Sequence, residues 1–285
     1  SNSMQTQDQV KELVRQKYSE IALQDKATNQ SSCCGAGGCS TEVYNIMADD
    51  YTQLEGYHPD ADLGLGCGLP TQFAKIRKGD VVIDLGSGAG NDAFIARHET
   101  GETGKVIGID FTPAMIDKAR QNAELRGFNN VEFRQGDIEK MPVTANTADV
   151  IVSNCVLNLV PNKDAVIREI YRVLKPGGHF SISDIVLEGQ LPKQIREAAE
   201  MYAGCVAGAI QKQVYLELIE GNGFTNMSIQ KDKAIIIPDD ILSQYLTPDQ
   251  ISAFKQSGTG VSSITVYAEK PIEEKKPCCA PGCCN

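Results

Sequence analysis

The sequence predicts an α/β fold in which helices cover both faces of a parallel β-sheet. The main observation is that short apolar runs alternate with helical patterns between residues 80 and 190, which is typical of parallel strands joined by crossover helices. A second observation is the glycine-rich turn DLGSGAG at 84–90, which directly follows the first apolar run. A third is that predicted helices run into helix-terminating residues, Gly127 in one case and Pro176 in another.

Each element of this core is predicted from its own residue pattern. The apolar runs predict buried strands at 80–86, 105–110, 131–137, 148–156 and 179–186. Apolar residues at helical spacing predict helices at 91–99, 113–127 and 164–178. Strands joined by such helices lie parallel, so their carboxyl ends meet at one edge of the sheet, where ligands of this fold class bind.

Further elements flank the core. An amphipathic helix at 4–25, a glycine-rich loop at 26–41 and two short helices before residue 80 precede it. Helical sequence in two pieces within 192–224 follows, and then late strands at 226–237 and 262–271 around a helix at 239–246. The expected divisions are an N-terminal helix with a Cys-rich loop (1–40), a cofactor-binding core with its cap (41–190), a helical lid with late strands (191–270) and a mobile Cys-rich tail (271–285).

Composition and charge argue against several classes of protein. The chain has 285 residues, a formal net charge of −10 and no long basic stretch, so nucleic-acid binding is not expected. No apolar run is long enough for a transmembrane helix, and no signal-peptide pattern follows Met4. We therefore expect a cytoplasmic protein that does not act at a membrane.

The ten cysteines fall into two sets. Three stand alone within the expected fold: Cys67, Cys155 and Cys205. Seven form short clusters near the two ends of the sequence: Cys33, Cys34, Cys39, Cys278, Cys279, Cys283 and Cys284. A disulfide-stapled secreted scaffold is a poor interpretation of this pattern, and the clusters lack the paired C-x-x-C spacing of structural zinc sites. The thiols are therefore expected to act as ligands or redox groups.

The glycine-rich turn and the ends of the next two strands form a candidate cofactor site. Asp110 ends the second strand, where a carboxylate can accept hydrogen bonds from ribose hydroxyls. The third strand ends in QGDI, where Asp137, with Ile138 beside it, could reach an adenine amino group. Three glycines would let the backbone turn sharply and a ligand lie against it: Gly86, Gly88 and Gly90.

Asp84 distinguishes this turn from that of a nicotinamide dehydrogenase. The spacing is D-L-G-x-G-x-G rather than G-x-G-x-x-G, and a carboxylate at this place would repel a pyrophosphate but suits a cationic or amine-bearing ligand. With GID at 108–110, QGDI at 135–138 and LKPGG at 174–178 in the same order, residues 80–190 resemble the class I S-adenosylmethionine-dependent methyltransferases, which have a Rossmann-like fold. The alternative is a glycine-rich turn that binds no ligand.

Cys155 stands at the end of the fourth predicted strand. In the methyltransferases that this sequence resembles, that end lies beside the transferable methyl group, and Asn154 and Cys155 occupy it here. A small buried side chain with a packing role is the simpler interpretation of Cys155. However, Cys67 lies in a glycine-rich turn ahead of the core, and Cys205 lies where this fold often inserts a substrate lid. Three such thiols suggest convergence on one soft, thiophilic ion.

At these cysteines the sequence is similar to the arsenite S-adenosylmethionine methyltransferases. The resemblance rests on GCG at 66–68, SNCVLNL at 153–159, YAGC at 202–205 and CCAPGCC at 278–284, around the methyltransferase motifs. It implies that an N-terminal cysteine takes part in redox turnover, with Cys33, Cys34 and Cys39 as alternatives. It also implies that three thiolates bind As(III): Cys67, Cys155 and Cys205.

The chemistry implied by this resemblance needs no general base. As(III) held by three sulfurs keeps a lone pair, which is the nucleophile, while the sulfonium methyl group is the electrophile. None of the three histidines lies in a catalytic motif. Because methylation formally oxidises arsenic, the implied partners are arsenite or its thiol complexes, and a thioredoxin or small-thiol reductant that opens a disulfide.

Two other functions stay open. A methyltransferase of the same fold could act on a small carbon nucleophile such as a quinone or sterol, but it would need a base or an aromatic-lined pocket, and it leaves Cys67 and Cys205 unexplained. A metalloid-sequestering protein would bind the metalloid without turnover, but this function does not explain the cofactor site.

Overall fold

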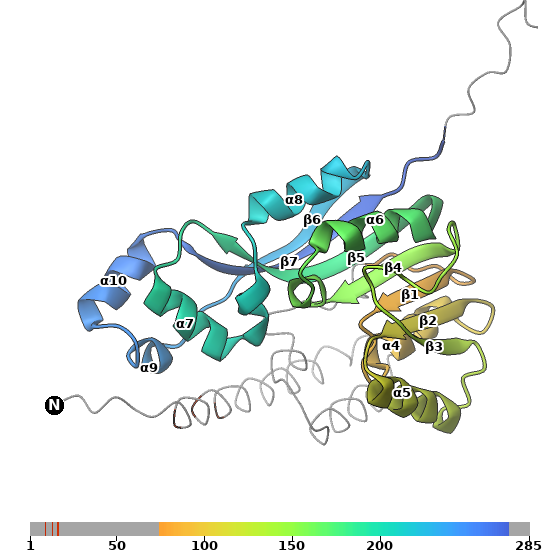
Figure 1. Cartoon of the computed structure of the whole chain (residues 1–285), viewed down its shortest axis with the longest axis horizontal. Coiled ribbons are helices and arrows are strands. Elements are labelled where there is room, and N and C mark those ends of the chain that lie inside the picture. Colours follow the sequence, from red (N-terminus) through yellow and green to blue (C-terminus); the bar gives the residue numbers. More distant parts are fainter. Residues whose placement is uncertain (1–8, 10–12, 14–15, 17–73, 274–285) are drawn as a thin grey trace, which may run out of the picture.

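A mixed β-sheet forms the centre of the molecule (Figure 1). The computed structural model describes Gln9, Leu13, Gln16 and residues 74–273, except for the side chains of Gly204 and Cys205. In this part of the chain the sheet has seven strands in the order β3-β2-β1-β4-β5-β7-β6. Their bounds are β1 Val81–Leu85, β2 Lys105–Asp110, β3 Val131–Gln135, β4 Ala148–Asn154, β5 Leu174–Glu188, β6 Thr225–Ala234 and β7 Gly260–Glu269.

The helices begin where the sequence supplies suitable first residues. Pro113 occupies the first turn of α5, the Asn162 side chain accepts a hydrogen bond from the Ala165 amide at the start of α6, and Thr247 forms a capping box with Gln250 at the start of α10. The described helices are α4 Asn91–Thr100, α5 Pro113–Leu125, α6 Lys163–Val173, α7 Lys193–Tyr202, α8 Lys212–Gly221, α9 Asp239–Leu242 and α10 Pro248–Gln256, with 3-10 turns η2 Leu157–Leu159 and η3 Gly204–Gly208.

The predicted parallel core is confirmed, and so is its cover of helices on both faces. Neighbouring strands among β1 to β5 are all parallel. Successive side chains of β4 point to opposite faces. Val150 and Val152 pack with residues of α4 and α5, whereas Ile151 packs with residues of α6 and α8. The carboxyl ends of β1, β2 and β4 therefore lie along one edge, between the two helical layers.

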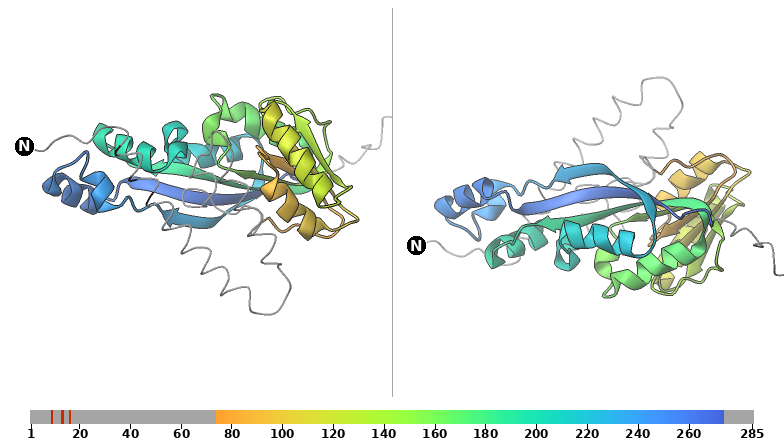
Figure 2. Two further views of the ribbon diagram at one scale, coloured as in Figure 1. Left: turned by 90° about the horizontal axis from the view of Figure 1, so that it is seen from below. Right: turned by 90° about the horizontal axis from the view of Figure 1, so that it is seen from above.

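The last two strands extend the same sheet in the antiparallel direction. β7 pairs with β5 along its whole length, and β6 pairs with β7 at the edge. β5 is 15 residues long and continues well past the end of β4, which stops at Asn154 opposite Ser183. Figures 1 and 2 show α7, α9 and α10 around this far end of the long strands, away from α4 and α5. There a second hydrophobic cluster forms, which includes Cys155, Ile185 and Ile241 and against which Leu13 also packs.

Several boundaries differ from the sequence-based expectations. The segment 174–178 is the start of β5 and not the end of a helix, so α6 stops at Val173. The fourth strand ends before Cys155. The region 192–224 contains the two predicted helical pieces, α7 and α8, with the unpredicted 3-10 turn η3 between them, and α10 was not predicted. These errors occur where pairing with a distant strand or a tight turn overrides local helical spacing.

Some predictions lie outside the described residues. They concern the loop at 26–41, the short helices before residue 74, the tail, and the cysteines other than Cys155 and Cys205. Of the predicted N-terminal helix, Gln9, Leu13 and Gln16 are described, and all three are helical. Among the described residues, no helix is both long enough and apolar enough to cross a membrane.

Candidate active site

The glycine-rich turn connects β1 to α4 at the carboxyl edge of the sheet. Gly86, Gly88 and Gly90 all have positive φ, a conformation that glycine adopts at little cost. The turn is tied to the end of β2, because the Ser87 amide donates to the Ile109 carbonyl at 2.9 Å. The sharp turn that the sequence predicted at these glycines is therefore present, and its contact with a cofactor stays a prediction.

Asp84 is a buried carboxyl beneath this turn. Its side chain is 1% exposed, and neither oxygen has a hydrogen-bond partner of ordinary length among the described residues, although the Ala93 amide faces it. Burial raises its pKa well above the usual value, and the charges of Asp92 and Asp110 raise it further. A buried carboxyl that has no cationic partner among the described residues fits a cationic ligand group, such as the sulfonium or ammonium of S-adenosylmethionine.

Asp92, in the first turn of α4, is a second acidic group that the sequence analysis missed. Burial raises its pKa to about 6, and a hydrogen bond from the Asn154 side chain opposes this shift. Asn154, a predicted cofactor residue, is thereby linked to the acidic pair from the end of β4. The signal in the sequence was the position of Asp92 two residues after the last glycine, where the helix N-terminus also favours an acidic side chain.

Asp110 lies at the end of β2, as predicted for a ribose-binding residue. One carboxyl oxygen accepts a hydrogen bond from the Gly88 amide at 2.9 Å, and the other accepts one from the Thr112 amide at 2.8 Å. Each carboxylate oxygen has a second lone pair, so hydroxyl groups can still be accepted. Phe111, which follows, is 76% exposed and offers a flat apolar surface for a base; the sequence analysis did not single it out.

Asp137 and Ile138 lie close to this edge in the chain that follows β3. The Gly136 amide donates to the Asp110 carbonyl at 2.9 Å, which joins the two strand ends. Asp137 is exposed, and its Oδ1 accepts a hydrogen bond from the Glu139 amide at 2.8 Å. The Ile138 side chain is 6% exposed and packs in the main core. Contact of either residue with a cofactor stays a prediction.

Cys155 begins the turn in which the chain leaves β4. Its amide donates to the Ser183 carbonyl at 2.7 Å, and its φ of 59° is left-handed, which is uncommon for a residue other than glycine. The side chain is 4% exposed and disulfide-bonded. Every other cysteine side chain lies outside the described part of the chain, and so does the second sulfur of this disulfide.

The turn at 155–158 touches the glycine-rich turn on one side. A Cβ atom on Gly86 would overlap the Val156 side chain, so only glycine lets the two segments approach this closely. Cys155 is thus one residue away from direct contact with the candidate cofactor turn. Proximity of Cys155 to the transferable methyl group stays a prediction.

On its other side the turn at 155–158 touches η3, which contains Cys205. A Cβ atom on Gly208 would overlap the carbonyl oxygen of Asn158. Ala203 and Val206, which flank Cys205, are buried in the same cluster as Cys155. The segments that carry Cys155 and Cys205 are therefore packed together. Cys67, Cys33 and Cys34 lie outside the described residues, and among described residues no three His, Cys, Asp or Glu side chains gather as a metal site.

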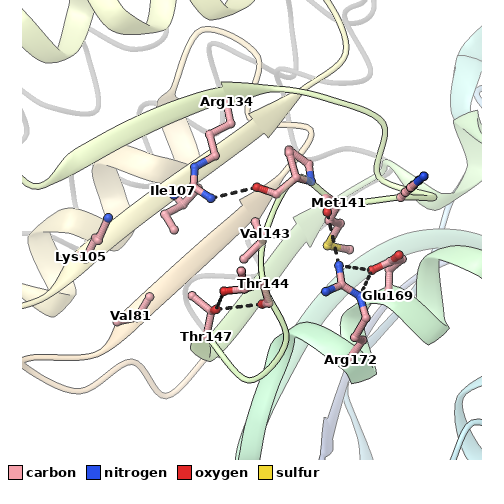
Figure 3. A pocket seen from close by; sticks show the side chains of 12 residues that line it. Val81, Lys105, Ile107, Arg134, Met141, Val143, Thr144, Thr147, Glu169 and Arg172 are labelled. Atoms are coloured by element: carbon pink, nitrogen blue, oxygen red, sulfur yellow. Dashed lines mark hydrogen bonds and ion pairs between the residues drawn. The ribbon is translucent and has the colours of Figure 1, made fainter.

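A separate cavity of about 690 Å³ lies on the α6 face of the sheet, beneath the helix-free connection from β3 to β4 (Figure 3). Two arginines close it by donating to this connection: Arg134 to the Pro142 carbonyl at 2.9 Å and Arg172 to the Met141 carbonyl at 3.3 Å. Their carboxylate partners are Glu132 and Glu169. Because the guanidinium groups are already engaged and no predicted site residue lines the cavity, we interpret it as structural.

Comparison with known proteins agrees with this geometry. Residues 76–223 match a family model described as a methyltransferase domain. With the strand order and the glycine-rich turn, this defines a class I S-adenosylmethionine-dependent methyltransferase. The predicted fold class and cofactor are thereby confirmed.

Relatives identify the family more narrowly. An arsenite methyltransferase of Halobacterium salinarum is 37% identical over 280 residues, which cover 94% of this chain and 68% of that protein. One of Aquipseudomonas alcaligenes is 32% identical over 242 residues, covering 82% of this chain and 68% of that protein. The crystal structure of CrArsM, an arsenic(III) S-adenosylmethionine methyltransferase from Chlamydomonas reinhardtii, matches with a TM-score of 0.60 and 33% identity, covering 72% of this chain and 68% of that one. The chain belongs to the arsenite methyltransferase family.

Replacing Asp110 tests the cofactor site. We expect Asp110→Ala to weaken S-adenosylmethionine binding by about 1–3 kcal/mol, because the ribose hydroxyls lose a charged acceptor and the Gly88 amide loses its partner. Titration calorimetry measures the change. Asp117→Ala, which removes an exposed carboxylate from the neighbouring helix α5, should leave the affinity unchanged. Equal affinities for Asp110→Ala and the unsubstituted protein would reject this role.

The acidic pair beneath the turn should make cofactor binding depend on pH. With a pKa of about 6 in the free protein, Asp92 holds a proton at lower pH, and a cationic ligand must displace it. We therefore expect affinity to rise as the pH increases through this value, by at most about tenfold per pH unit for one linked proton. Calorimetry in buffers of different ionisation enthalpy should detect proton release. Asp92→Asn should reduce the linked proton release near pH 6, and an unchanged pH dependence of affinity around this value in the variant would contradict the assignment.

Proposed function

We propose that this chain transfers the methyl group of S-adenosylmethionine to As(III), and that Cys155 supplies one of the thiolates that hold the arsenic. The observation that carries the proposal is the position of the turn at 155–158, which contacts the cofactor turn through Val156 and Gly86, and η3 through Asn158 and Gly208. A thiol held between a methyl donor and a second cysteine segment fits a soft acceptor better than a carbon nucleophile.

On the cofactor side, bound S-adenosylmethionine supplies an electrophilic methyl group. Burial beneath the glycine-rich turn raises the pKa of Asp84 and Asp92, so a cationic ligand that stabilises their ionised form is favoured there. Asp110 orients the ribose from the end of β2, and exposed Phe111 offers a surface for the adenine. These contacts fix the direction from which the methyl group is presented.

On the acceptor side, three sulfurs around As(III) leave its lone pair free to attack the methyl carbon. The proposed ligands are Cys155 with Cys205 and Cys67. Since the arsenic carries no proton in this complex, no general base is needed. This agrees with the two described histidines, because His98 is exposed at the end of α4 and His179 hydrogen-bonds the Ala74 carbonyl at 2.5 Å, at the opposite edge of the sheet.

Turnover requires reduction as well as methylation. Gain of a methyl group converts As(III) formally to As(V), and two thiolates that join in a disulfide return two electrons to the arsenic. The disulfide form of Cys155 fits the oxidised stage of such a cycle. We propose that a thioredoxin or a small thiol then reopens the disulfide, in a reducing compartment such as the cytoplasm. Cys33 or Cys34 is the proposed N-terminal redox partner.

The deciding experiment is incubation with arsenite, S-adenosylmethionine and a reducing thiol, followed by arsenic speciation and assay of S-adenosylhomocysteine. We expect methylated arsenic, with one S-adenosylhomocysteine formed for each methyl group that the arsenic gains. A parallel reaction with a demethylated quinol tests the carbon-nucleophile alternative. Methylation of the quinol but not of arsenite would reject the proposal, and arsenite binding without S-adenosylhomocysteine would favour sequestration.

A further inference from the structure

Asp184 is a buried carboxyl beside the Cys155 turn that the proposed chemistry does not use. It lies on β5 and has no exposed surface. Its Oδ2 accepts a hydrogen bond of 2.5 Å from the Tyr215 hydroxyl on α8, while Oδ1 has no partner of ordinary geometry among the described residues. The backbone amides of Leu157 and Asn158 face the same carboxyl, and the charge of the Lys163 ammonium group on α6 favours its ionised form.

Three successive residues of β5 hold the turn at 155–158. The Ser183 carbonyl accepts the Cys155 amide at 2.7 Å. The Asp184 carboxyl faces the Leu157 and Asn158 amides. The Ile185 carbonyl accepts the Asn158 side-chain amide at 2.8 Å. Side-chain groups thus replace the ladder hydrogen bonds that a longer β4 would have made.

Burying the Asp184 carboxyl costs free energy, which argues against a packing role alone for this residue. Burial raises the pKa of Asp184 to about 7, against the opposing effects of Tyr215, Lys163 and the two amides. An apolar residue would pack at this position without that cost. Nevertheless, a carboxyl group can accept hydrogen bonds from the Leu157 and Asn158 amides, which an apolar side chain cannot do. These amides follow the end of β4 and lie outside its strand pairing. Its neighbours Ile182 and Val186, on the same face of β5, are apolar core residues.

We propose that Asp184, oriented by Tyr215, is a positioning residue that fixes the turn carrying Cys155 against the cofactor turn. Leu157 packs with the main core on the Asp184 side of the sheet, whereas Cys155 packs with the second cluster on the other side. By binding the Leu157 and Asn158 amides, Asp184 would therefore fix the position of Val156 against Gly86 and the direction of the Cys155 thiol. This inference rests on the proposed methyl transfer to thiol-bound arsenic.

The test compares Asp184→Asn and Tyr215→Phe with a control of similar burial. Thr100→Val removes a buried hydrogen bond of 2.6 Å to the Asp80 carbonyl at the opposite edge of the sheet. We expect Asp184→Asn to lower kcat for arsenite methylation about 10- to 100-fold, because small displacements of reacting groups cost that much. S-Adenosylmethionine affinity should stay within about twofold, because Asp184 is not among the cofactor contacts. Tyr215→Phe should act in the same direction by about three- to tenfold.

A second readout does not depend on turnover. In the reduced protein without arsenite or cofactor, the alkylation rate of Cys155, followed by mass spectrometry of its peptide, should rise several-fold in Asp184→Asn and Tyr215→Phe and stay unchanged in Thr100→Val. If Asp184→Asn does not fold, Tyr215→Phe decides alone. Unchanged alkylation and kcat in the variants, or equal effects in Thr100→Val, would overturn the inference. If the unsubstituted protein did not methylate arsenite at all, the proposed function would be refuted instead. The alkylation rates would then still test whether Asp184 positions the turn that carries Cys155.

Discussion

Replacing Cys155 with serine is expected to abolish arsenite methylation while leaving S-adenosylmethionine affinity within about twofold. Serine has nearly the same shape, so the buried site at 4% exposure should still pack. Its hydroxyl is a hard oxygen that is protonated at neutral pH, and a thiophilic centre does not favour it. The loss should therefore appear in kcat and in arsenite binding, and not in the fold. A steady-state assay with cofactor calorimetry on the same preparation measures both.

The control for this prediction is the same Cys-to-Ser change at a cysteine near the end of the sequence, outside the predicted set of arsenic ligands. Cys283→Ser, in the C-terminal cluster, should keep a near-normal rate at saturating arsenite. Thermal melting of both variants under reducing conditions identifies any loss of stability. Full activity of Cys155→Ser would favour the carbon-nucleophile alternative, since that reaction needs no thiolate at this position.

Gly208→Ala is expected to have the second-largest effect, although Gly208 carries no reactive group. A Cβ atom would overlap the carbonyl oxygen of Asn158. The Cβ is fixed to the backbone of η3 and the oxygen belongs to the backbone of the turn at 155–158, so one of the two segments must move. Overpacking of this kind typically costs about 1–3 kcal/mol of folding stability. Because η3 contains Cys205, we also expect a loss of about tenfold or more in kcat for arsenite methylation.

Gly221→Ala is the matched control, because among the described residues beyond its chain neighbours and its own helix backbone the added methyl group would meet no atom within 4 Å. It should keep the unsubstituted rate and stability, or gain a little stability from the higher helix propensity of alanine. Chemical denaturation and the methylation assay at saturating arsenite separate the two effects of Gly208→Ala. If the loss of activity in Gly208→Ala were no larger than the fraction of unfolded protein explains, the close packing of the two cysteine segments would have no role in catalysis.

The parts of the fold that depend on local sequence could be predicted. The first five strands, the helices between them and the glycine-rich turn have short-range signals, and the structure confirms their order. The start of β5 at Leu174 could not be predicted, because LKPGG reads as a helix end until its pairing with Ala148 is known. The pairing of β7 between β5 and β6 is likewise a long-range property that no local pattern contains.

The residues of the candidate site also fall into those that local sequence predicts and those that depend on long-range contacts. Asp84, Asp110 and Cys155 could be predicted because each lies within the last two residues of a strand, or directly after it, at the ligand edge of the sheet. Asp92 and Phe111 lie next to those positions but had no motif of their own. Asp184 and Tyr215 could not be recognised, because their hydrogen bond joins positions 31 residues apart, and each reads as an ordinary member of a strand or helix.

The central claim is that the Cys155 sulfur binds arsenic beside the methyl donor. X-ray absorption at the arsenic edge, on the reduced protein loaded with one equivalent of arsenite, counts the sulfur atoms around arsenic. The account predicts three sulfur neighbours in the unsubstituted protein and two sulfurs with a lighter oxygen or nitrogen neighbour in Cys155→Ser. An unchanged set of three sulfurs in Cys155→Ser would contradict it, because the arsenic would then be held by other thiols, away from the turn that meets Gly86.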